Sequence, residues 1–149
     1  MCDACQGAKL EKTGDLQAPR YFIHPYFDTF TIPQIVNLTI APPFNTPTFT
    51  LEPHPQLTAA ESMLVTTHLR ELEIAKRYIR FFRNEHRRLL KNVRGLRNSG
   101  QDVGATLAVF RAGAAIPTQN SWQHIFYTGV VENLDLLDYL INDDLPALP

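Results

Sequence analysis

The 149-residue sequence has little of what secreted and membrane proteins depend on. Its two cysteines are too few for a disulfide framework. No stretch approaches the roughly 20 apolar residues of a membrane-spanning helix, and the first residues lack the basic start and apolar stretch of a secretion signal. We therefore expect an intracellular protein with no membrane span, located in the cytoplasm or within an assembled particle or organellar complex.

The familiar catalytic motifs are missing as well. The sequence contains no GxxxxGK or GxGxxG phosphate loop, no GxSxG nucleophile turn and no HExxH zinc motif. Its seven glycines are scattered, so they form no loop that could cradle a nucleotide. We expect a non-enzymatic protein that has no catalytic residues and needs no cofactor.

The composition is that of a single folded domain. Hydrophobic residues make up 44% and charged residues 19% of the chain, which is ordinary for a globular protein and too apolar for wholesale disorder. Fourteen basic residues nearly balance fifteen acidic ones, which leaves a net charge of -1. Because this overall charge is so small, it indicates no class of partner.

Proline divides the chain into two parts. Eight of the eleven prolines precede residue 58, and such a density excludes long helices from that region. Within it, Val36, Leu38 and Ile40 alternate with polar residues as in a half-buried strand, and residues 48–51 alternate likewise. We predict an extended arm over residues 1–57, with a short β-hairpin, and a helical domain over residues 58–149.

The helical part begins at a capping box formed by Thr58 and Glu61. No proline follows until Pro117, so one helix is predicted to run to the stop at residues 98–100. Apolar residues and two histidines recur along it in a seven-residue pattern that suits lengthwise helix packing. The pattern consists of Val65, His68, Leu72, Ala75, Ile79, Phe82, His86, Leu89, Val93 and Leu96.

Shorter helices are predicted over residues 102–115 and from Trp122 onward, with Gly129 as a point of division. His68 and His86 are expected to be buried, hydrogen-bonded residues that fix the helix register. The predicted fold class is mainly α: an extended N-terminal arm, one long helix, and two or three shorter helices packed with it as a bundle.

Aromatic residues are frequent in the arm. This segment is too apolar to extend into solvent, so we expect it to pack on its own helices or on another protein. The arm aromatics are Tyr21, Phe22, Tyr26, Phe27, Phe30, Phe44 and Phe49. We predict that they form a partner-binding surface, because three or four helices of this size offer too little area to shelter them.

Positive charge is concentrated in one short stretch. Residues 76–97 hold nine basic residues and one acid, Glu85. Six of the nine follow each other at spacings of three and four, which places them in one stripe on a helix. This basic stripe consists of Lys76, Arg80, Arg83, Arg87, Lys91 and Arg94. Such a stripe is typical of a surface that contacts phosphates or an acidic partner.

An acidic stretch offers the basic stripe a partner within the chain. Residues 132–144 carry five carboxylates and no base, namely Glu132, Asp135, Asp138, Asp143 and Asp144. If the last helix folds back on the long one, these carboxylates would meet the stripe within the molecule or between two copies. A solvated helix face is a further interpretation. The sequence leaves these alternatives open.

Cys2 and Cys5 have the CxxC spacing with which two thiolates bind zinc. A tetrahedral site needs two more ligands, and His24 and His54 lack a metal-binding spacing. A redox site is not favoured either, because no strand precedes the motif. We expect two reduced cysteines on an N-terminal tail and no metal site.

Two functions remain. The one that we expect is a non-enzymatic structural or scaffold subunit of a larger assembly, such as a virion or an organellar complex. It would dock on other protein subunits, or on copies of itself, through its arm and its helical bundle. The alternative is a nucleic-acid-binding helical protein that uses the basic stripe within residues 76–97.

Overall fold

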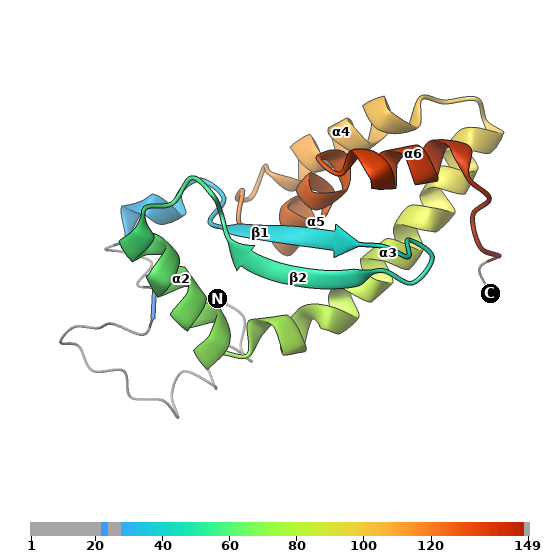
Figure 1. Ribbon diagram of the computed structural model, residues 1–149. Coiled ribbons are helices and arrows are strands. Elements are labelled where there is room, and N and C mark those ends of the chain that lie inside the picture. The colour runs from blue at the N-terminus through green and yellow to red at the C-terminus, as the bar shows by residue number, and fades with distance from the viewer. Residues whose placement is uncertain (1–21, 24–27, 148–149) are drawn as a thin grey trace.

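In the computed structural model, which describes residues 22–23 and 28–147, helices dominate and two strands form a hairpin (Figure 1). The elements are η1 (Thr29–Thr31), β1 (Val36–Ala41), β2 (Thr48–Pro53), α2 (Ala59–Glu71), α3 (Ile74–Asn98), α4 (Val103–Ala114), α5 (Trp122–Val131) and α6 (Leu134–Asn142). The predicted fold class, mainly α with a short hairpin, is confirmed. Much of the predicted arm, residues 1–21 and 24–27, lies outside the described residues.

The hairpin forms where the alternation of apolar and polar residues predicts it. β1 and β2 pair antiparallel, with Leu38 opposite Leu51 and Ile40 opposite Phe49. Val36, Leu38 and Ile40 are buried, whereas alternate residues of β2 stay exposed. A two-stranded sheet is marginal in water by itself. The packing of β1 on α5 therefore stabilises the hairpin.

α2 begins at the predicted capping box. The hydroxyl of Thr58 accepts from the N–H of Glu61 at 3.3 Å, and the Glu61 carboxylate accepts from the N–H of Thr58 at 2.8 Å. The prediction of one unbroken helix up to residue 98 is wrong, because Leu72 and Glu73 separate α2 from α3. Glu73 has a left-handed backbone with φ 49°, which no regular α-helix can include.

The break lets two neighbouring apolar residues face the same interior. Leu72 and Ile74 are both buried, in a cluster that Phe22, Tyr78 and Trp122 help to cover. On a continuous helix, the side chains of residues two positions apart point in directions about 160° apart, so Leu72 and Ile74 could not share this cluster. Burial of both side chains therefore outweighs the unfavourable backbone at the break.

Helices α4, α5 and α6 each begin with a side-chain cap, made by Asp102, Ser121 and Asn133 respectively. The helix predicted over residues 102–115 is confirmed as α4. The region from Trp122 onward divides into two helices, but at residues 132–133 and not at the predicted Gly129, because α5 runs through Gly129 and ends at Val131. A Cβ at Gly129 would lie 2.7 Å from the Leu38 carbonyl oxygen, so this glycine serves the close approach of α5 to β1.

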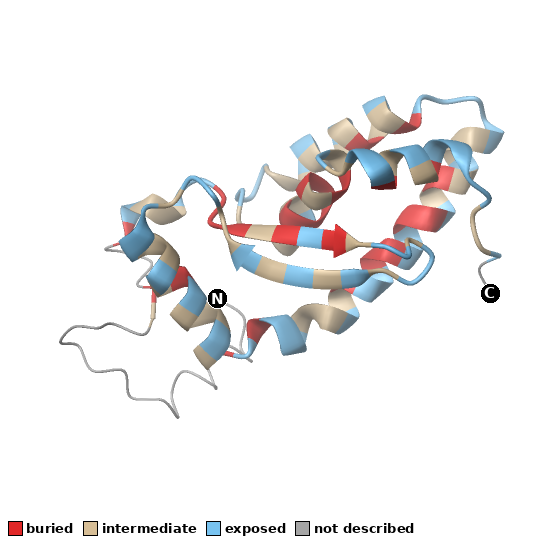
Figure 2. Ribbon diagram, viewed as in Figure 1, coloured by how far each residue is buried: buried red, intermediate tan, exposed pale blue. Residues whose placement is uncertain are grey.

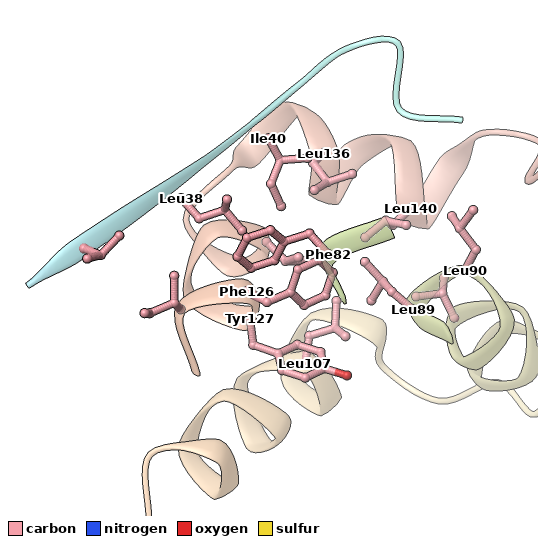
Figure 3. Packing of buried hydrophobic residues seen from close by; sticks show 14 of the residues in the cluster. Leu38, Ile40, Phe82, Leu89, Leu90, Leu107, Phe126, Tyr127, Leu136 and Leu140 are labelled. Atoms are coloured by element: carbon pink, nitrogen blue, oxygen red, sulfur yellow. The ribbon is translucent and has the colours of Figure 1, made fainter. Parts of the chain in front are cut away.

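Apart from Leu72 and Ile74, the buried apolar residues of the hairpin and the helices form one core (Figures 2 and 3). Leu38 and Ile40 point from β1 into the same interior as Phe82 of α3 and Phe126 of α5. The hairpin, which the sequence places in the arm, thus shares its core with the helices. α3 runs beneath the hairpin and turns one face to this core, which leaves its other face toward solvent (Figure 2).

Candidate anion-binding surface

The solvent face of α3 carries only one sign of charge. Five members of the basic stripe are exposed there: Lys76, Arg80, Arg83, Arg87 and Lys91. These exposed cations extend over about 22 Å of helix axis at 1.5 Å per residue. The single acid of α3, Glu85, is turned inward and is 4% exposed. A merely solvated helix face usually mixes both signs, and this one does not.

The acidic stretch does not neutralise these cations. Among residues 22–23 and 28–147, no ion pair links an exposed cation of α3 to a carboxylate of residues 132–144. Glu132 instead lies 3.8 Å from Arg111 of α4, and the buried Glu85 lies 3.1 Å from Arg88. Within the described residues the structure therefore shows no acid–base contact of this kind, and a contact between two copies stays a prediction.

Arg94, the sixth member of the basic stripe, has a different role. Its Nη2 donates to the carbonyl oxygen of Leu145 at 3.1 Å and also to that of Pro146. Arg97 Nη1 donates to the Asp143 carbonyl at 2.7 Å and lies 3.5 Å from that of Leu140. Arg97 thus caps the C-terminal end of α6, where the helix dipole is negative, and Arg94 holds the segment that follows α6. Arg94 therefore lies outside the exposed set.

Four of the seven arm aromatics lie within the described residues. Tyr21, Tyr26 and Phe27 lie outside the described residues. Phe22, Phe30, Phe44 and Phe49 are half-buried. Phe49 stacks on Phe82 with centroids 5.8 Å apart, and Phe44 packs on Tyr139 at 5.6 Å. Because these contacts are made within the chain, they lend no support to a partner at the hairpin, and partner docking by the arm stays a prediction.

His86 fixes the position of the hairpin turn on α3. The imidazole is 3% exposed, and its Nε2 lies 2.8 Å from the Phe44 carbonyl oxygen. Because a carbonyl can only accept, Nε2 carries the proton and donates. Burial lowers the pKa of His86, and the hydrogen bond to Phe44 opposes that shift in part. The prediction that His86 is a buried, hydrogen-bonded residue is confirmed.

His68 is also hydrogen-bonded but only half-buried. Its Nδ1 accepts from the backbone N–H of Ile23 at 3.2 Å, and its ring meets the edge of Phe22 at 6.1 Å. The residue therefore ties the chain before η1 to α2, a contact between residues 45 positions apart.

A pocket between the hairpin turn and α3 was not visible in the sequence. It is lined by Asn45, Thr46, Pro47, Phe49, Arg83 and Arg87. The two arginines were singled out by their spacing on the helix, but nothing local indicated that the hairpin turn would lie beside them. The pairing of the turn with α3 arises only in the folded chain.

A second polar pocket also joins distant segments, among them His54, Arg111, His124, Thr128 and Glu132. His124 Nδ1 lies 3.2 Å from the Arg111 carbonyl, so Nδ1 donates and Nε2 is left as an acceptor for the Thr128 hydroxyl at 3.4 Å. These hydrogen bonds give partners to the Arg111 carbonyl of α4 and to the His124 ring and Thr128 hydroxyl of α5, where the two helices meet. They tie the helices together.

The remaining site predictions have no structural counterpart in the described part of the chain. Cys2 and Cys5 lie outside it, and nowhere within it do three side chains of metal-binding type come together. None of the helices of residues 22–23 and 28–147 combines the length and apolar character that crossing a membrane requires. No family model, curated protein or solved structure matches this chain significantly.

Proposed function

We propose that this protein is a non-enzymatic nucleic-acid-binding protein that contacts phosphates through the exposed cations of α3. The proposal is carried by one observation: five cations share one exposed face of α3 and have no acidic partner in the described residues. This exposed row consists of Lys76, Arg80, Arg83, Arg87 and Lys91. Neighbouring members lie one helical turn apart. Such a row suits the regularly spaced charges of a phosphate backbone.

The surroundings of the row strengthen this interpretation. α3 is held by the core along its length, since Phe82, Leu89 and Val93 on its opposite face are buried. The cations therefore project from a rigid helix. Phosphate contacts of this kind supply affinity that depends on salt and not on base sequence.

Neutralising the middle of the row tests the proposal. The variant R80Q/R83Q/R87Q removes three positive charges, and the control Q56E/Q101E/Q123E changes the net charge by the same amount at exposed glutamines elsewhere. Fluorescence anisotropy with a labelled duplex should show about a hundredfold or greater loss of affinity for the first variant at low salt. The control should bind within a few-fold of the unmodified chain.

Equal losses in the two variants would mean that only net charge matters, and no binding by the unmodified chain would remove the proposal altogether. Circular dichroism on both variants checks that the helices are retained. Since all six substituted side chains are exposed, we expect no change in fold.

An assembly subunit remains the second candidate, and a separate surface favours it. Val109 of α4 is 67% exposed, Ile116 in the turn after α4 is 85% exposed, and Leu134 of α6 is 77% exposed. Large apolar side chains that are exposed together are typical of protein contacts, and these three are the residues to test. Native mass spectrometry of the purified chain tests this candidate: a stable oligomer or complex supports it, and a monomer at micromolar concentration contradicts self-assembly.

A further inference from the structure

The pocket between the hairpin turn and α3 gathers hydrogen-bond donors that have no other role. Its volume is about 370 Å³. Among the described residues, no carboxylate lines it, and no hydrogen bond or ion pair engages the side chains of Asn45, Thr46, Arg83 or Arg87. The amide, the hydroxyl and the two guanidinium groups can therefore all donate to one ligand. A ligand that matches these donors must therefore carry several hydrogen-bond acceptor atoms.

The walls of the pocket are held in place from behind. His86 lies between Arg83 and Arg87 in the sequence and bonds the Phe44 carbonyl, directly before Asn45. On β2, directly after the turn, Phe49 stacks on Phe82 of α3. The backbone N–H of Thr46 donates to the Pro43 carbonyl at 3.0 Å and closes the turn. The turn and the two arginines thus keep a fixed relation to each other.

The two cations in the pocket are both arginines, whereas both lysines of the exposed row lie outside it. A guanidinium group offers a planar fork of donors that fits phosphate oxygens in pairs, which an ammonium group cannot do. A phosphate monoester has three acceptor oxygens and a charge between −1.5 and −2 at neutral pH. A backbone phosphodiester has one charge and fewer free oxygens.

We propose that this pocket binds one phosphate monoester, the terminal phosphate of a nucleic-acid strand whose backbone follows the rest of the exposed row. The inference rests on the proposed function, and it adds recognition of a strand end to binding of the backbone. The volume leaves room for the adjoining sugar beside the phosphate. Free phosphate is chemically the same group, so the experiment compares the two sources.

The test measures binding of the full chain to one oligonucleotide that carries a 5′ phosphate, a 3′ phosphate or no terminal phosphate. We expect about tenfold tighter binding for a phosphorylated end, the gain from one more pair of charge-assisted hydrogen bonds. R83Q/R87Q should abolish this difference. K76Q/R80Q removes the same amount of positive charge from α3 outside the pocket. It should weaken the binding of all three oligonucleotides and preserve the preference for a phosphorylated end.

Equal binding of all three oligonucleotides would refute the binding of a terminal phosphate by the pocket, and so would the same loss of preference in both double variants. Either result would leave the proposed function standing. Inorganic phosphate alone, followed through the NMR signals of the Arg83 and Arg87 side chains, separates the two claims. If phosphate shifts these signals but no oligonucleotide binds, the pocket is a phosphate site and the nucleic-acid function is refuted. If neither phosphate nor any oligonucleotide binds, both are refuted.

Discussion

At the scale of single residues, Gly129 decides how closely α5 can approach β1. A Cβ there would meet the Leu38 carbonyl oxygen at 2.7 Å, a distance at which backbone must move. Glycine is otherwise unfavourable inside a helix, by roughly 0.5–1 kcal/mol relative to alanine. The sequence pattern suggested a break at this position, because an isolated glycine weakens a helix and its packing role depends on a strand 90 residues away.

Gly129→Ala should therefore lower the free energy of unfolding by about 1–3 kcal/mol, the usual cost of overpacking. Gly95→Ala is the matched control, because nothing lies within 4 Å of a Cβ at Gly95 on α3. That change should raise the free energy of unfolding by up to about 1 kcal/mol. Urea denaturation measures both, and a stabilised G129A variant would contradict the packing of α5 on β1.

His86 makes the fold sensitive to pH. Burial lowers the pKa of the folded imidazole below its usual 6.5, with the Phe44 hydrogen bond opposing the shift. Between the two pKa values the unfolded chain binds more protons than the folded chain, so stability increases with pH in that window. The contribution of His86 is complete above pH 6.5 and declines as the pH decreases toward the folded pKa.

We expect the full-length chain to lose stability between pH 7.5 and pH 5, and His86→Gln to lose less over the same interval. Gln can still donate to the Phe44 carbonyl but does not titrate. Guanidinium denaturation at the two pH values gives the comparison. Equal pH dependence in the two proteins would show that His86 does not titrate in this range.

At the scale of elements, the sequence could predict where α2 begins but not where it ends. The capping box at Thr58 and Glu61 is a local signal, and the alternation in β1 is equally local. The end of α2 has no glycine, proline or asparagine to mark it. It depends on a cluster in which Leu72 and Ile74 meet Trp122, and such a contact cannot be read from neighbouring residues.

Glu73→Gly tests the left-handed break directly. A glycine relieves the side-chain clash at φ 49°, so the free energy of unfolding should rise by up to about 1 kcal/mol despite the greater entropy of the unfolded chain. Ala60→Gly, at an exposed helical position of α2, should lower it by about 1 kcal/mol. If E73G were as destabilising as A60G, α2 and α3 would be one continuous helix in solution.

At the scale of the whole molecule, charge and core are arranged on opposite faces of α3. The spacing of the basic residues could be read from the sequence, and the structure keeps five of the six at the surface. The sequence could not show that Arg94 bonds the segment after α6, because Leu145 is 51 positions away. Nor could it show that a hairpin turn lies beside Arg83 and Arg87, since the core that joins the turn to α3 forms only on folding.

The exposed row on α3 gives the molecule a local positive field although its net charge is -1. Such a field attracts a polyanion only where the row is, and its strength falls as salt screens it. Salt dependence of nucleic-acid binding is therefore the property that most directly reports contacts made by these five cations.

The decisive measurement is the association constant of the full chain with a duplex oligonucleotide over a range of salt concentrations. If the five cations contact phosphates, the logarithm of the constant should fall linearly with the logarithm of the salt concentration, with a slope of about −4 to −5. R80Q/R83Q/R87Q should reduce the slope to about −2. Absent binding at low salt, or an affinity that salt leaves unchanged, would contradict the account.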